Sequence, residues 1–139
     1  MRYSLLFAIS LIPFCSFAQT IIPDECDDKL FTRVENIASI KSSKEAFEDS
    51  LTAFLQSKKA FRDKDRIKFR FIVTTRSNIF ELEKESGAWK KENVVREAII
   101  KYSSLWKPAV QNGRNVCSYV MLELNIEGDK LHISISQDS

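Results

Sequence analysis

One segment in the second half of this chain places the tightest limits on its fold. Over Glu92 to about Trp106, apolar residues recur at the spacing of a helix that turns one face toward a core. Pro108 lacks an amide hydrogen and restricts the residue before it, so the helix must end there. Asn112-Gly113 suits a tight turn, and an alternating strand follows over Val116–Ile126. We therefore expect a helix packed on an antiparallel sheet.

Strands are predicted on both sides of this segment. Residues 67–73 alternate between apolar and charged, and a returning strand starts near Phe80, after a turn at 75–78. A second turn at 127–130 precedes a last strand over 131–136. The expected fold class is α+β, with a small antiparallel sheet of about four strands packed on a helix.

The first eighteen residues have the pattern of a secretory signal peptide. Arg2 precedes the apolar run Tyr3–Phe17, and Ser16 and Ala18 suit cleavage before Gln19. We expect an exported protein, periplasmic or secreted. An uncleaved anchor and a lipidated Cys15 are the alternatives.

The residues that follow predict two helices ahead of the sheet. Apolar residues recur at helical spacing over Asp27–Ile40, and Ser42–Glu45 reads as a capping box for a second helix that ends near Ser57. The expected organisation is a signal peptide (1–18), an N-terminal helical segment (19–58) and an α+β domain (59–139).

Composition limits the function classes. Hydrophobic residues make up 44% of the chain and charged residues 29%, as in globular proteins. A net charge of +2 is too weak to specify a nucleic-acid partner. Cys26 and Cys117 remain after removal of the signal peptide, and in an oxidising compartment they either form a disulfide or stay as two free thiols.

No catalytic, cofactor or metal site is predicted. His132 is the single histidine, and with two lone cysteines it lacks any ligand spacing, so it reads as a surface residue. The acidic residues around Cys26 lack the alternation and the glycine of a calcium loop. Three isolated glycines exclude a phosphate loop. We expect no enzyme activity and no small-molecule substrate.

Basic residues are frequent over residues 58–70. Such a run is usually a solvated face, and here Asp63 and Asp65 interrupt it. Binding to an anionic surface such as lipid or lipopolysaccharide is the alternative.

The helix end and the turn after it resemble the closing part of TonB C-terminal domains. In that family the helix often ends in Trp-x-Pro, matched by Trp106 and Pro108, and a glycine turn follows, matched by Gly113. The resemblance covers Lys68 to about Ile126 and implies a binding module that pairs with a partner through a sheet edge. The partner it implies is a protein, such as an outer-membrane receptor or another envelope protein. The candidate partner-binding strand contains Val116, Val120, Leu122 and Leu124.

The chain also departs from that family. The only prolines after the signal peptide are Pro23 and Pro108, so the proline-rich stalk of an energy transducer is missing. The tyrosine-proline signature ahead of the first strand is also missing, and the added strand Leu131–Ser136 would occupy one sheet edge. The alternative function is a structural envelope protein that associates with itself, as a homodimer, through an edge or through the Cys117/Tyr119/Met121 face.

Overall fold

The computed structural model describes residues 22–27 and 29–138, which form two helices and eight strands. The long elements are α1 (Lys44–Ser57), β2 (Arg66–Val73), β3 (Ile79–Ala88), α2 (Glu92–Lys101), β7 (Ser118–Glu127) and β8 (Lys130–Gln137). The short elements are the 3-10 turns η1 (Asp24–Cys26) and η2 (Ser103–Leu105), and the strands β1 (Ser39–Ile40), β4 (Trp106–Lys107), β5 (Ala109–Gln111) and β6 (Arg114–Val116).

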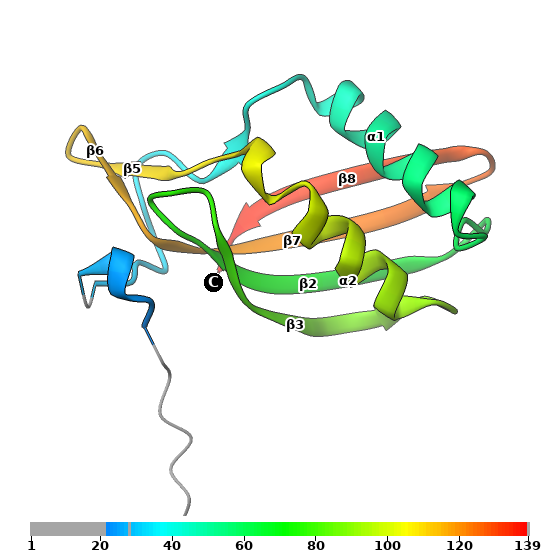
Figure 1. Cartoon of the computed structure of the whole chain (residues 1–139), viewed down its shortest axis with the longest axis horizontal. Coiled ribbons are helices and arrows are strands. Elements are labelled where there is room, and N and C mark those ends of the chain that lie inside the picture. The colour runs from blue at the N-terminus through cyan, green and yellow to red at the C-terminus, as the bar shows by residue number, and fades with distance from the viewer. Residues whose placement is uncertain (1–21, 28, 139) are drawn as a thin grey trace, which may run out of the picture.

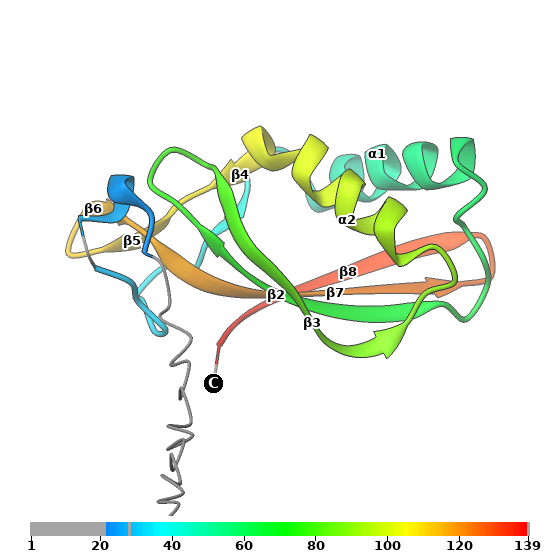
Figure 2. The same ribbon diagram turned by 60° about the horizontal axis from the view of Figure 1, so that its bottom comes forward.

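The four long strands form one antiparallel sheet in the order β3-β2-β7-β8. Both helices lie on the same face of that sheet, as Figures 1 and 2 show. The predicted fold class, an antiparallel sheet packed on helix, is therefore confirmed. The predicted final strand is also present, and it pairs with β7 along its length.

A single large hydrophobic core fills the space between the helices and the sheet. Side chains from α1, α2, β2, β7 and β8 contribute to it, so the segment before residue 59 shares a core with the segment after it. Trp106 is fully buried at its centre and makes edge-to-face contacts with Phe47 and Phe71. The prediction that Trp106 is a core aromatic is confirmed.

The helix that precedes Trp106 ends earlier than the sequence predicted. α2 stops at Lys101, and a 3-10 turn leads into β4, where Trp106 is extended. The reason is tertiary pairing, because Trp106 is the register partner of Ile40 in β1 and the Leu105 carbonyl accepts a hydrogen bond from the Lys41 amide. The tight turn at Asn112-Gly113 is confirmed, with φ angles of 51° and 73°.

The helix predicted over Asp27–Ile40 is wrong. The described residues of this stretch are extended or irregular, with bridges from Phe31 to Ser118 and from Asn36 to Val110. Their backbone groups bond to the strands beyond, which competes with helix formation. The second predicted helix is confirmed as α1, but its N-cap is Ser43 rather than Ser42, and the Ser43 hydroxyl accepts from the Ala46 amide.

A second, smaller apolar cluster lies on the face of the sheet opposite the helices. The Cys26–Cys117 disulfide, with a Cα separation of 5.6 Å, packs there beside Ile72. Half-buried Leu30 and Tyr119 adjoin the cluster. The disulfide alternative of the sequence analysis is therefore the one observed, and β7 is apolar on both faces as predicted.

No helix within residues 22–27 and 29–138 is long and apolar enough to cross a membrane. The predicted signal peptide lies outside the described residues, so its cleavage before Gln19 and the lipidation of Cys15 stay predictions.

Candidate partner-binding edges of the sheet

The predicted partner-binding strand corresponds mainly to β7, which lies inside the sheet between β2 and β8. β7 pairs with β2 on one side and with β8 on the other, so its backbone groups are used on both edges. Val120, Leu122 and Leu124 are buried in the core, and Val116 lies in β6, half-buried. β8 covers the edge of β7 that β2 leaves free, so the candidate partner-binding strand of the sequence analysis has no open edge in the described structure.

The outer edge of β8 is itself partly covered by side chains. The Ile133 amide donates a hydrogen bond of 2.9 Å to Oε1 of Glu48 on α1. Further along, the amide side chain of Gln137 bonds to both the N–H and the carbonyl of Val34. One backbone group that an added strand would need, the Ile133 amide, is therefore already used, and the Gln137 side chain holds Val34 beside the end of β8.

A gap remains between these two caps. This gap is a cavity of about 500 Å³ beside β1. It is lined by the apolar side chains of Ile40, Ile133 and Ile135 and by three serines and Lys44. Three residues of β8 lie between Ile133 and Gln137, and both ends of this stretch are engaged by contacts within the chain. The cavity can take one apolar side chain more readily than an extended segment.

The opposite edge of the sheet, along β3, is paired with no other strand in the described part of the chain. Its first half is supported from α2, since Arg96 donates to the Leu82 carbonyl and Lys84 forms an ion pair with Glu92 at 3.0 Å. The hydrogen bond from Lys84 is the main reason why the pKa of Glu92 lies below its ordinary value, and Arg96 contributes to the same shift.

The second half of β3, Glu85–Ala88, is exposed at every residue. Its side chains after Glu85 are small, so they leave the main chain accessible. Gly87 has a φ of +85°, and a Cβ there would lie 2.3 Å from the Arg66 carbonyl oxygen of β2. Glycine is therefore required for β3 to stay paired to β2 at this point.

β3 also carries two irregularities in its pairing with β2, near Phe69 and near Phe71. Glu81, with a φ of 52°, lies at one of them. Bulges and charges of this kind limit the uncontrolled pairing of sheet edges. The first half of β3 is thus protected, whereas Ser86–Ala88, beyond the bulge at Glu85, pairs regularly with β2 and has an open outer side.

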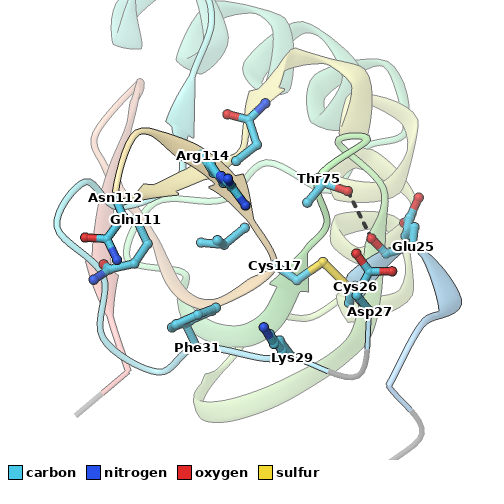
Figure 3. A pocket seen from close by; sticks show the side chains of 12 residues that line it. Glu25, Cys26, Asp27, Lys29, Phe31, Thr75, Gln111, Asn112, Arg114 and Cys117 are labelled. Carbon is cyan, nitrogen blue, oxygen red and sulfur yellow. Dashed lines mark hydrogen bonds between the residues drawn. A yellow bond between two sulfur atoms is a disulfide. The ribbon is translucent and has the colours of Figure 1, made fainter.

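A pocket of about 470 Å³ lies next to the disulfide, between the N-terminal segment and the β5–β6 hairpin (Figure 3). Lys29, Phe31 and Arg114 line it together with several amide side chains. The Thr75 hydroxyl donates to the Glu25 carbonyl at its rim. Both cysteines are bonded to each other, so the pocket has no thiol nucleophile.

Titratable groups elsewhere form structural pairs. Arg70 lies over the ring of Tyr119 and forms an ion pair with Asp138. Burial lowers the pKa of Arg70, but the contacts with Asp138 and Tyr119 raise that pKa by more, so the guanidinium stays charged. His132 is exposed on β8, as predicted for a surface residue. Within the described ranges, no three His, Cys, Asp or Glu side chains cluster as metal ligands would.

The chain was compared with protein-family models, curated proteins and solved structures. None of them matches. The resemblance to TonB C-terminal domains therefore stays a prediction from sequence, and the function has to be argued from the two sheet edges themselves.

Sequence reasoning missed the residues that distinguish these edges. Glu48 bonds to the Ile133 amide across a separation of 85 residues, and Gln137 bonds to Val34 across a separation of 103 residues. Local sequence patterns do not predict contacts between residues so far apart. The exposure of β3 could have been predicted, because Glu81, Glu83 and Glu85 recur at every second position, as charged side chains of an exposed strand do.

Proposed function

We propose that this chain is a non-enzymatic, exported protein-binding module of the cell envelope, similar to TonB C-terminal domains, and that it binds an extended segment of its partner along β3. The observation that carries the proposal is the difference between the two edges. On β8, Glu48 bonds to the Ile133 amide and Gln137 holds Val34 beside the strand end, whereas Glu85–Ala88 of β3 is exposed and unpaired on its outer side in the described structure. Strand addition needs an open edge.

The charge of β3 favours a particular kind of segment. Glu85 is the one charged residue of Glu85–Ala88, Glu83 lies two positions before it, and Lys84 between them is paired with Glu92, so the strand is acidic where its open edge begins. Opposite charges on directly paired strands stabilise the pairing, and like charges weaken it. The expected partner segment is extended and carries lysine or arginine at alternate positions.

The same charge argues against the alternative, self-association through β3. Two copies paired edge to edge would bring their glutamates together, which is unfavourable. The other surface considered for self-association, the Cys117/Tyr119/Met121 face, is occupied in part: Cys117 is in the disulfide and Arg70 covers the ring of Tyr119. We therefore expect a monomer, and a light-scattering mass of a dimer would favour the structural envelope protein instead.

Peptide selection tests the proposed function. Extended peptides with alternating basic residues are selected on the purified protein, and bound peptide is located by amide hydrogen exchange. We expect slower exchange along β3 and no change along β8. Protection confined to β8, or no difference in affinity between basic peptides and matched acidic ones, would contradict the proposal.

A photo-crosslinking residue gives a second test. Placed at Ser86, which is exposed on β3, it should react with bound peptide; placed at Gln56, which is exposed on α1, it should not. The intact mass of the protein isolated after expression of the full chain tests export separately, since cleavage before Gln19 is expected.

A further inference from the structure

Lysines from three separate connections gather at one end of the molecule. We call this the basic end and define it by Lys58, Lys59, Lys64, Lys90, Lys91 and Lys130. Lys58, Lys59 and Lys64 lie in the α1–β2 loop, Lys90 and Lys91 lie in the β3–α2 loop, and Lys130 begins β8 just after the β7–β8 turn. The two loops and the turn lie at the right-hand end of the sheet in Figure 1.

Backbone and side-chain hydrogen bonds hold these loops together. Nζ of Lys91 donates to the Lys58 carbonyl at 3.1 Å, and the Trp89 indole donates to the Ala60 carbonyl at 2.7 Å. The Gly128 amide donates to Asp63, which joins the β7–β8 turn to the loop before β2. The gathering of lysines is therefore fixed by the fold and does not follow from the run in the sequence alone.

Two carboxylates of this region are paired with arginines: Asp65, which is buried, with Arg62, and Glu123 with Arg66. Asp63 and Glu127 accept hydrogen bonds from neutral amides and keep their charge, and Asp129 is exposed next to Lys130. The six lysines of the basic end therefore outnumber three carboxylates that no arginine neutralises in the described structure. None of the six lysines of the basic end forms an ion pair within the part of the chain that the structure describes.

Five of the six lysines are exposed; Lys91 is half-buried. Lys59 and Lys64 have φ angles of 54° and 69°, in the left-handed region that favours glycine. Lys59 follows the C-cap of α1, at the position where a helix commonly ends in glycine. A favourable interaction with the end of the helix explains a positive charge at Lys58 and Lys59, but Lys64, Lys90 and Lys130 lie on other elements.

We infer that the basic end docks the protein onto the surface of a bilayer that contains anionic phospholipids. A juxtaposed group of lysines is attracted to anionic headgroups without a shaped pocket, and each lysine near the surface adds to the attraction. The exposed large apolar side chains of the described residues are Phe80 and Ile100, which lie at the start of β3 and near the end of α2, so the basic end has no exposed aromatic side chain. Nucleic-acid surfaces usually combine basic residues with aromatic stacking, so lipid is the better match.

The assignment of the basic run to a solvated face is thereby revised in part. Lys68 and Arg70 do lie on a strand face, paired across the sheet from Glu123 and Met121. The lysines that precede that strand belong to the basic end instead. This inference does not depend on β3, and the two surfaces can be tested separately.

Vesicle co-sedimentation tests the inference. The full-length chain, expressed and purified as it is exported, is mixed with vesicles of phosphatidylcholine alone or of phosphatidylcholine with phosphatidylglycerol. We expect binding to the anionic vesicles and none to the neutral ones. Binding should be lost near 1 M salt, where the Debye length falls to about 3 Å.

Two matched triple variants locate the surface. Lys59→Gln, Lys64→Gln and Lys90→Gln together remove three exposed charges of the basic end, and we expect affinity for anionic vesicles to fall by about tenfold or more. Lys29→Gln, Lys41→Gln and Lys107→Gln remove three exposed charges elsewhere and should change it less than about twofold. Circular-dichroism melting shows that both variants fold, and neither alters β3.

Three results would overturn the inference. The first is an absence of binding to anionic vesicles by the unmodified protein. The second is an equal loss of binding in both triple variants, which would mean that only overall charge matters. The third is tighter binding to a short DNA duplex than to the vesicles in direct competition, which would identify a different polyanion.

Discussion

Replacing Trp106 with alanine should destabilise the protein strongly. The side chain is fully buried at the centre of the core, with its ring 6.2 Å from that of Phe47 and 5.3 Å from that of Phe71. It also joins α1 to the sheet, because Trp106 itself lies in β4 while Phe47 is on α1 and Phe71 is on β2.

The magnitude follows from the buried area and from one unsatisfied group. A buried tryptophan removes about 150–250 Å² from water, worth about 4–6 kcal/mol at about 25 cal/mol per Å². Measured truncations of this kind cost about 3–5 kcal/mol. The indole nitrogen of Trp106 is buried without a hydrogen-bond partner in the described structure, which already costs the native state about 1–3 kcal/mol. We therefore expect a loss near the lower limit, about 3 kcal/mol.

Urea unfolding followed by circular dichroism measures the change. Trp106→Phe should cost less than half as much as the alanine variant, because it keeps an aromatic ring and removes the unpaired N–H. Phe80→Ala is the matched control, since Phe80 is 42% exposed and should cost less than about 0.5 kcal/mol. If the alanine variant at position 106 lost less than about 1 kcal/mol, the reasoning from burial would be refuted.

Three other predictions concern local features. Replacing Cys26 and Cys117 together with serine should lower the free energy of unfolding by about 4–5 kcal/mol, given their separation of 91 residues, and equal unfolding midpoints for oxidised and mutant protein would contradict this. Gly87→Ala should be much more destabilising in urea than Gly128→Ala, because the new Cβ meets the Arg66 carbonyl at position 87 and meets nothing within 4 Å at position 128. The pKa of Glu92 is lowered in the folded protein, so its contribution to the free energy of unfolding is present above the unfolded pKa of about 4.3 and is lost as the pH falls through the folded pKa. Glu92→Gln should therefore weaken the loss of stability at acidic pH. An unchanged dependence of stability on pH would count against the ion pair with Lys84.

The sheet and both helices could be predicted because each has a local pattern. Alternation identified β2, β7 and β8, and the helical stripe identified α1 and α2. The segment before α1 could not be predicted, because its apolar residues serve different neighbours: Leu30 packs in the disulfide cluster, while Val34 and Ile40 pack on the main core. The apolar residues of this segment are spaced as in a helix, but they pack into two different clusters and do not form one helical face.

The candidate site was predictable only in kind. The resemblance pointed to a sheet edge, and the added final strand was correctly expected to cover one edge. Which edge stays open depends on Glu48 and Gln137, whose contacts exist only after the chain has folded. The basic end likewise needed the fold, since Lys90 and Lys130 are far in sequence from Lys58.

The position of β7 in the sheet sets the order in which this protein can assemble. β2 and β3 are neighbours in sequence and can pair early, whereas β7, which joins β2 to β8, begins at Ser118, well after Arg66 begins β2. Cys26 is separated by 91 residues from Cys117, which directly precedes β7, so we expect the disulfide to close when the central strand docks. Cross-link formation therefore reports late folding, and a chain stalled before β7 would expose the apolar face of β2 to chaperones and proteases.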